Sequence, residues 1–127
     1  MTDWTSDELD RIGAAEELQL SSMRRDGTLR SPVTMWDVCL DDEVYVRAYK
    51  GRTSPWFRSA LTQHGGRIRA GGVDNDVTFV EAGDDNTIND QIDAAYRAKY
   101  RRYAPSIVDS VMTPDARAAT IRVVPRA

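Results

Sequence analysis

The sequence predicts an α+β fold dominated by β-structure: a small antiparallel barrel of about six strands with about three helices. Three observations predict it. Short segments rich in β-branched and aromatic residues follow one another, glycine or aspartate turns separate them, and only one long stretch has helical periodicity. Short strands joined by tight turns pair antiparallel, and closing such a sheet into a barrel removes its exposed edges.

The N-terminal part predicts a helix over 6–18 followed by a hairpin. Thr5 and Glu8 have the spacing of a capping box, in which the threonine side chain accepts the Glu8 N–H and the glutamate reaches back. Apolar residues with roughly helical spacing follow this box. Arg25-Asp26-Gly27 is typical of a tight turn between strands over 19–23 and 28–30.

Two consecutive strands are predicted over 33–40 and 44–49, with Asp41-Asp42-Glu43 as the polar turn between them. The first is rich in β-formers. In the second, small apolar residues at even positions alternate with tyrosine and arginine at odd positions. That alternation indicates a strand with one buried face.

The second half of the chain predicts two helices and three strands. Ser54 and Pro55 have the residue types of a helix N-terminus, and the short helix they open should end at Gly65-Gly66. The stretch 87–103 is the clearest helix, because it has an apolar face, acids near its start and bases near its end. Pro105 should interrupt this pattern. The strands are expected over 67–70, 76–82 and 120–124.

Length and composition indicate a single domain over residues 1–127 that is large enough to bury a core. No apolar run approaches the length needed to span a bilayer, and the polar, acidic N-terminus does not resemble a signal peptide. The single cysteine, Cys39, excludes an internal disulfide and a cysteine-based metal cluster. A cytoplasmic location without membrane association is therefore expected.

The stretch 44–73 contains no acidic residue, although the protein as a whole has a formal charge of −3. It contains six basic residues with four aromatic residues among them: Arg47, Lys50, Arg52, Arg58, Arg67 and Arg69, and Tyr45, Tyr49, Trp56 and Phe57. A local cationic and aromatic surface of this kind suits a flat, phosphate-bearing ligand. All aspartate and glutamate residues lie outside this stretch, so the rest of the chain carries the net negative charge.

The candidate anion site is the turn Lys50-Gly51-Arg52 together with the helix that begins after Ser54. A helix N-terminus offers unpaired backbone N–H groups, Gly51 allows close backbone approach or a positive φ, and the two bases add charge-assisted hydrogen bonds. Arg47 precedes the turn and could face the same hollow if the strand bends. The alternative is a solvated cationic turn that prevents strand pairing at a sheet edge.

Other chemistry-bearing side chains have simpler interpretations. Trp56 is either a stacking wall for a planar ring or, as the composition of small cores favours, a core residue. His64 is interpreted as a residue at a helix C-terminus, and Cys39 as a small buried hydrophobe. The aspartate pairs at 41–42 and 84–85 are interpreted as turns. The basic and aromatic cluster 96–103 is interpreted as a helix C-terminus that packs on the barrel, with a second wall of the anion hollow as the alternative.

An ordered set of residues resembles the uncharacterised "domain of unknown function two-two-five-five" family over nearly the whole chain. The set is Asp26-Gly27, Pro32-Val33-Thr34-Met35-Trp36, Tyr45-Val46-Arg47, Gly51, Trp56, Gly65-Gly66-Arg67-Ile68, Ala95-Tyr96-Arg97-Ala98-Lys99-Tyr100 and Ala119-Thr120-Ile121-Arg122-Val123-Val124-Pro125. This family is similar to the FMN-binding split-barrel superfamily. The resemblance implies a six-stranded split barrel, commonly a homodimer with flavin sites between the subunits.

The stretch from Ala48 to Leu61 also resembles the deazaflavin-dependent nitroreductase-like branch of that superfamily. Lys50-Gly51 matches the glycine turn that lies against the cofactor phosphate in that branch, and Trp56 matches its tryptophan. Ala48 stands where that branch has a serine, and Ser59-Ala60 stands where it has an asparagine. The resemblance implies FMN or a deazaflavin as cofactor, held by Arg47, Lys50, Gly51, Arg52 and Trp56.

Three functions remain open from the sequence. The first is a flavin- or deazaflavin-dependent oxidoreductase of unknown substrate, in which the cofactor supplies the chemistry and no acid–base pair is needed from the protein. The second is a cofactor-free split barrel that binds or transforms a small anionic, phosphate-bearing metabolite. The third is nucleic-acid binding by the basic segment, against which the overall pI near 5.1 argues.

Overall fold

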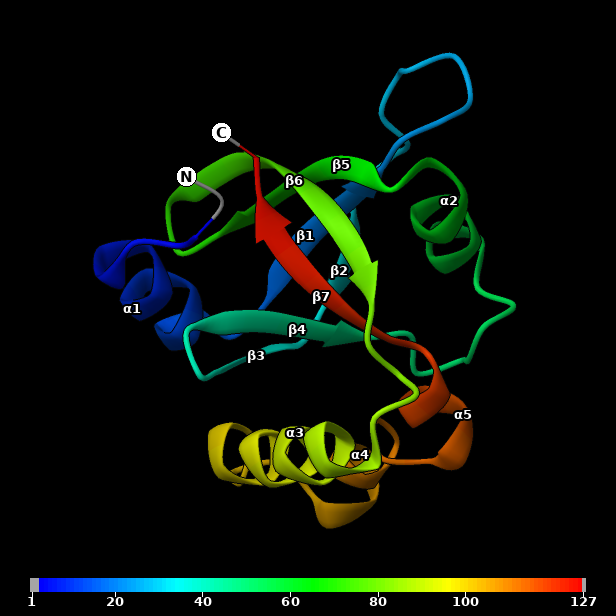
Figure 1. Cartoon of the computed structure of the whole chain (residues 1–127). Coiled ribbons are helices and arrows are strands. Elements are labelled where there is room, and N and C mark those ends of the chain that lie inside the picture. The colour runs from blue at the N-terminus through cyan, green and yellow to red at the C-terminus, as the bar shows by residue number, and fades with distance from the viewer. Residues whose placement is uncertain (1–2, 127) are drawn as a thin grey trace.

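The computed structural model describes residues 3–126, in which seven antiparallel strands curl into a nearly closed barrel with five helices around it (Figure 1). The prediction of a β-dominated α+β fold built as an antiparallel barrel is confirmed. The expected counts of six strands and three helices are wrong. The predicted strand over 33–40 is two strands, the predicted strand over 28–30 is reduced to an isolated bridge at Leu29, and two short helices near the C-terminus were missed.

The strands follow the order β2-β1-β5-β6-β7-β4-β3 across the sheet. Their bounds are β1 (Leu18–Ser22), β2 (Val33–Met35), β3 (Asp37–Leu40), β4 (Glu43–Arg47), β5 (Gly65–Ala70), β6 (Val73–Glu81) and β7 (Thr120–Pro125). The helices are α1 (Ser6–Ala14), α2 (Pro55–Gln63), α3 (Asn86–Lys99), α4 (Pro105–Asp109) and α5 (Pro114–Ala118). No helix within the described range is both long and apolar enough to cross a membrane.

The segment 33–40 closes the barrel because it divides at Trp36. Its first half, β2, pairs with β1 at one edge of the sheet, and its second half, β3, pairs with β4 at the other edge. One continuous segment thus spans both edges, which leaves the sheet with little free edge to pair with another chain. The change of partner also explains why the single predicted strand is two.

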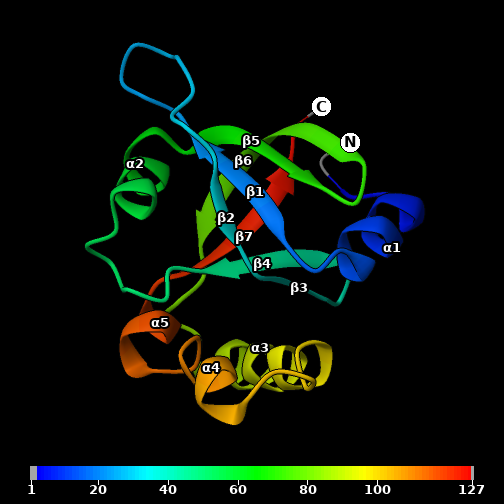
Figure 2. The same ribbon diagram turned by 180° about the vertical axis from the view of Figure 1, so that it is seen from behind.

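Strand β4 is buried on both faces, contrary to the predicted single buried face. Val44 and Val46 belong to the core inside the barrel. Tyr45 and Arg47 point to the other side and are also buried, at 7% and 3% exposure. Helices α3, α4 and α5 gather on that side of the barrel, as Figures 1 and 2 show from opposite directions.

A second apolar cluster lies between this helical layer and the barrel. It contains Val38 and Tyr45 from the strands and Ile92, Tyr96, Tyr100, Val108 and Val111 from the helical side. The barrel interior has its own core, into which α1 contributes Ile12 and α2 contributes Phe57. The molecule is therefore built from two apolar layers that share the sheet.

Local signals explain the helix bounds. The predicted capping box is present, since Thr5 accepts the Glu8 N–H at 3.1 Å and Glu8 accepts the Thr5 N–H at 2.9 Å. This helix ends at Ala14 rather than at 18, because Leu18 already enters the sheet. Helix α3 ends at Lys99 rather than at 103. Pro105 is the first residue of α4, so it begins a new helix after α3 has ended. Pro114 likewise begins α5.

A hairpin loop over residues 23–32 projects from the barrel between β1 and β2 (Figure 2). The predicted turn is present, with Gly27 at φ +88° and its N–H donated to the Arg24 carbonyl at 3.0 Å. The isolated pairing of Met23 with Leu29 continues the ladder beyond β1. This loop lies beside α2, which follows the anion-site candidate in the chain.

Candidate functional site

A groove of about 430 Å³ lies between the barrel wall, the N-terminal end of α2 and the helix α4. Its size falls within the range of small-molecule sites, roughly 300–1,000 Å³. Four segments and two further residues line it: 33–36, 47–50, 54–56, 110–111, Glu17 and Ile107.

The walls of the groove are mainly apolar and aromatic. Val33, Tyr49 and Ile107 are exposed by 37%, 59% and 50%, and all three lie on this lining. Only one other large hydrophobic side chain in the described range, Leu29, is as exposed as these. Exposed apolar side chains gathered around one hollow are a common feature of binding surfaces.

Two tryptophans contribute rings to the lining and are held from behind. Trp36 stacks on Tyr100 with ring centroids 4.0 Å apart and planes 7° apart. Trp56 contacts Phe57 edge-on at 5.8 Å and is 9% exposed. Trp56 packs in the barrel core, as the core interpretation expects, and it also lines the groove.

The N-terminus of α2 opens onto this groove, because Ser54, Pro55 and Trp56 line it. The Ser54 side chain makes no capping hydrogen bond, and the first turn of the helix contains no acidic residue. First-turn N–H groups of a helix without such a cap carry partial positive charge and can bind an anion. Lys50 lies on the same lining and is exposed, with its Nζ atom 5.7 Å from the centre of the Tyr49 ring.

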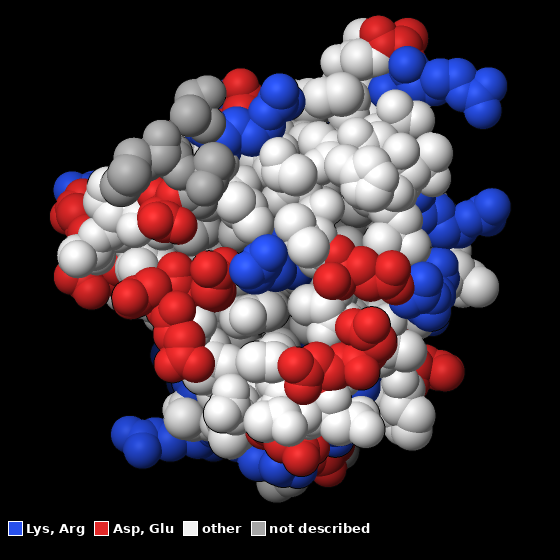
Figure 3. Space-filling model, viewed as in Figure 1, with Lys and Arg blue, Asp and Glu red and all other residues white. Residues whose placement is uncertain are grey.

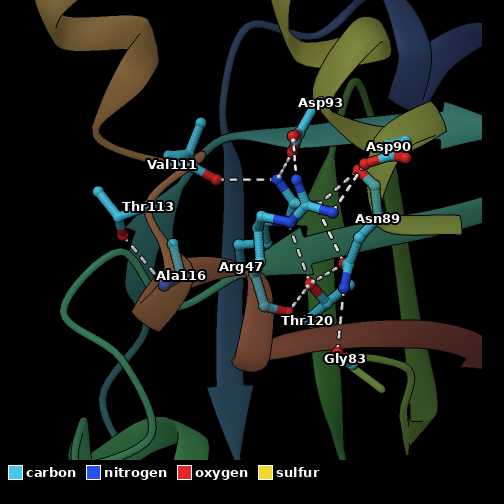
Figure 4. Close-up of polar contacts among 10 residues, drawn as sticks. Arg47, Gly83, Asn89, Asp90, Asp93, Val111, Thr113, Ala116 and Thr120 are labelled. Atoms are coloured by element: carbon cyan, nitrogen blue, oxygen red, sulfur yellow. Dashed lines mark hydrogen bonds and ion pairs between the residues drawn. The ribbon is translucent and has the colours of Figure 1, made fainter. Parts of the chain in front are cut away.

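Arg47 lines the groove as well, but its guanidinium points away, into the helical layer (Figure 4). Its Nε donates to Thr120 Oγ1 at 3.0 Å, and one terminal nitrogen donates to Asp93 Oδ1 at 2.5 Å and to the Val111 carbonyl at 2.9 Å. The other terminal nitrogen donates to the carbonyl and the side-chain Oδ1 of Asn89, at 3.1 and 3.0 Å.

These contacts use all five N–H donors of the guanidinium. Arg47 therefore has no donor left for a phosphate in this arrangement, and its side chain serves to connect β4 with α3 and β7. Arg117 extends the network, because it binds Asp93 at 3.0 Å and Asp90 at 2.8 Å.

The remaining two predicted contacts lie outside the groove lining. Gly51 has φ +89°, as its predicted role in a turn requires, but a Cβ at this position would lie 3.3 Å from the Asp115 Cβ. Arg52 forms an ion pair with Glu81 and donates to the Ala118 carbonyl at 2.9 Å. Of the five residues predicted to hold a cofactor, Lys50 and Trp56 thus present side chains to the groove.

A buried polar junction lies behind Trp36. Asp37 is fully buried, and burial raises the pKa of its carboxyl to about 6, although Lys99 at 3.3 Å opposes this shift. The Tyr100 hydroxyl donates to the Glu16 carbonyl at 2.8 Å and accepts the Asp37 N–H at 3.2 Å. The second carboxylate oxygen of Asp37 has no hydrogen-bond partner among the described residues.

The simpler interpretations of other polar residues agree with their surroundings. Burial raises the pKa of the Cys39 thiol to about 11, so the thiol stays protonated at neutral pH and is a poor nucleophile. His64 ends α2 in the left-handed conformation at φ +61°. Asp41 and Asp42 form the expected turn, both with positive φ. Residues 3–126 contain no group of three potential metal ligands close enough to hold an ion.

Sequence reasoning missed the partners of Arg47. Asn89 and Asp93 are buried, and they share a helix face with the apolar Ile92 and Tyr96. Two polar residues spaced i, i+4 among buried positions need polar partners, which could have indicated a buried base opposite α3. The sequence indicated the part of the groove at Lys50, Ser54 and Trp56. It did not indicate the walls formed by 33–36 and 110–111, because these segments lie far from that part in the chain.

The strand order and the groove define the molecule as a nearly closed antiparallel barrel with a hollow of small-molecule size beside its helices. The chain belongs to the family described as an uncharacterized protein conserved in bacteria (DUF2255), whose sequence model matches residues 8–123. No curated protein matches the chain.

Solved structures share this fold at low sequence identity. A conserved hypothetical protein from Mycobacterium tuberculosis is 14% identical with a TM-score of 0.59, and the match covers 99% of this chain and 82% of the other. A FAD-binding protein from Mesorhizobium loti is 14% identical with a TM-score of 0.52, over 96% and 88% of the two chains. A FAD and heme binding protein from Mycobacterium smegmatis is 18% identical with a TM-score of 0.52, over 98% and 67%.

Proposed function

We propose that the groove binds a flavin- or deazaflavin-type cofactor and that the protein is an oxidoreductase whose substrate is unknown. One observation carries this proposal: a largely apolar, aromatic hollow of about 430 Å³ meets an uncapped helix N-terminus and Lys50 at the same place. A planar ring and a phosphate need these two environments side by side. Two proteins with the same fold are named for binding FAD, which supports the choice of ligand class.

The residues of the groove fit the two parts of such a ligand. The isoalloxazine or deazaflavin ring would lie against the apolar wall that includes Trp56 and Met35. The phosphate would accept hydrogen bonds from the N–H groups of the first turn of α2 and from Lys50. A bound flavin or deazaflavin supplies hydride transfer, and the protein supplies binding, orientation and exclusion of water.

Flavin titrations test this proposal directly. FMN, riboflavin and a 5-deazaflavin are titrated into the protein while ligand fluorescence and the visible absorbance band are recorded. We expect quenching and a band shift at micromolar concentration. Replacing Lys50→Gln should weaken FMN binding by about tenfold to a hundredfold, since a charged hydrogen bond contributes about 1.5–3 kcal/mol. Riboflavin, which has no phosphate, should be unaffected.

The matched control is Arg97→Gln, which removes the same charge from an exposed position on α3, away from the groove. Its FMN affinity should equal that of the unmodified protein. Absence of quenching and of any band shift with all three ligands would rule out the flavin proposal.

A second function is favoured by the position of Arg47. Three of the four expected phosphate contacts are engaged elsewhere: the Arg47 guanidinium has no free donor, Gly51 packs against Asp115, and Arg52 pairs with Glu81. This supports a cofactor-free barrel that binds a small anionic metabolite at Lys50. Inorganic phosphate binding that is lost in Lys50→Gln, in a protein that binds no flavin, would identify this case. The homodimer implied by the family resemblance stays a prediction, which the molar mass in solution measures.

A further inference from the structure

We propose that the protein has a second anion site, a cradle of four arginines that binds an oligophosphate, meaning two or three linked phosphate groups. The arginine cradle is a hollow of about 390 Å³ lined by four arginines together with apolar and neutral polar residues: Arg24, Arg25, Arg30 and Arg58, with Met23, Pro55, Ser59, Thr62 and Gln63. It lies between the projecting hairpin and α2 and is separate from the groove, although Pro55 lines both.

Within the described residues, the arginines of the cradle have no ion-pair partner. No acidic residue lines the hollow, and none of its four arginines forms an ion pair with a described acidic side chain. Arginines elsewhere differ, since Arg67 binds both Asp74 and Asp76. In Figure 3, basic side chains project from the edge of the molecule that carries the hairpin and α2.

The hairpin holds its part of the cradle in place. The Arg24 guanidinium donates to the Leu29 carbonyl at 2.6 Å, and the Arg30 N–H donates to the Ser22 carbonyl at 2.8 Å. Asp26, the acid of this loop, is turned to its own neighbour and accepts the N–H and the hydroxyl of Thr28, at 3.0 and 2.7 Å. The Asp26 carboxylate forms no ion pair with the cradle arginines, although Arg24 is close enough to contribute to the lowered pKa of Asp26.

Arg58 completes the cradle from a different part of the chain. It is exposed on α2, where Ser59, Thr62 and Gln63 of the same helix also line the hollow. The hairpin and α2 are separated by more than twenty residues in sequence, so the convergence of their arginines depends on the fold.

Charge and chemistry indicate an oligophosphate. One guanidinium group can bind two phosphate oxygens at once, and a chain of two or three phosphates offers several such pairs. Four guanidinium groups around one hollow therefore match a short phosphate chain. A single phosphate or carboxylate would leave most of the cradle unsatisfied. A long nucleic acid is less suitable, because the rest of this net acidic protein repels an extended polyanion.

Tripolyphosphate is the test ligand, and isothermal titration calorimetry at low salt measures its affinity. We expect binding that weakens about tenfold or more in Arg58→Gln and further in Arg25→Gln/Arg58→Gln, because each variant removes charge-assisted hydrogen bonds. Arg97→Gln/Arg101→Gln, an exposed pair outside the cradle that removes the same charge, should bind as the unmodified protein does. Thermal unfolding of each variant verifies that it is folded.

Several results would overturn the proposal. Equal losses in the cradle pair and the control pair would mean nonspecific attraction. Loss of tripolyphosphate binding in Lys50→Gln but not in Arg58→Gln would place the anion in the groove. Tighter binding of a 12-nucleotide single-stranded DNA than of tripolyphosphate would identify a nucleic-acid surface instead. Flavin binding is measured on the same variants and should be unchanged, so failure of either site leaves the other testable.

Discussion

The Arg47 guanidinium forms the centre of the contact between the barrel and the helical layer (Figure 4). It is fully enclosed and binds groups from α3, β7 and the turn at Val111. Burying a charge without partners costs several kcal/mol, so these contacts are required for the fold whatever they do for a ligand. The alternation of apolar and polar residues along this strand placed Arg47 on the face opposite Val46, but it did not predict that a helical layer would cover that face.

Replacing Arg47→Met should destabilise the protein by about 3–5 kcal/mol, because Asp93 and Asn89 would lose a buried partner. Urea unfolding followed by far-UV circular dichroism measures this loss. Arg97→Met, the exposed control, should change stability by less than about 0.5 kcal/mol. A loss below about 1 kcal/mol in Arg47→Met would show that the network contributes little to stability.

At the scale of elements, the turn between β4 and α2 places the groove and α5 on its two sides. Lys50 faces the groove, whereas Gly51 faces Asp115 of α5. The glycine has a positive φ, and its N–H donates to the Ala48 carbonyl at 2.8 Å. A side chain at this position would meet both backbone strain and a crowded neighbour.

Two glycines with nearly equal φ separate these effects. Gly51→Ala and Gly27→Ala should each lower the free energy of unfolding by about 1–2 kcal/mol. The reason is that alanine is strained in the left-handed conformation, and the two φ values are +89° and +88°. Only Gly51→Ala should lose more, because its new Cβ lies 3.3 Å from Asp115 whereas Gly27 has nothing within 4 Å. Chemical unfolding of the two variants measures the difference. Equal losses of stability would mean that α5 shifts to make room for the new Cβ without destabilising the protein.

At the scale of the whole molecule, the barrel and the helical layer also meet at Asp37. This residue begins β3, and Lys99 of α3 binds its carbonyl at 2.9 Å and its carboxylate at 3.3 Å. Burial raises the pKa of the carboxyl from its ordinary 3.8 to about 6. Between these values the folded protein keeps a proton that the unfolded chain has released.

The stability due to Asp37 is therefore greatest below about pH 4 and falls as the pH rises to 6, by about 3 kcal/mol in total. Asp37→Asn cannot titrate and should lack this fall. Unfolding free energies of the two proteins are compared at intervals from pH 4 to 6.5. The free energy of unfolding of Asp37→Asn should rise relative to that of the unmodified protein as the pH increases across this range. A difference between the two proteins that does not change with pH would contradict the raised pKa.

Local chemistry was sufficient for several elements. The Thr5–Glu8 capping box, the Gly27 turn and Ser54-Pro55 at the start of α2 depend on neighbouring residues, and all are present. The division of 33–40 was not predictable in this way. Its two halves have similar composition, and only their different partners, β1 and β4, separate them at Trp36.

The sequence by itself determined the class of fold, the turns and the excess of basic charge over 44–73, because each depends on residue type and spacing along a short stretch. Only the tertiary structure decided where each charge points. It turned Arg47 into a buried network, set Arg52 against Glu81, and brought Arg58 beside a hairpin more than twenty residues away. Contacts between distant segments depend on how the layers pack, and patterns within short stretches of sequence do not specify that packing.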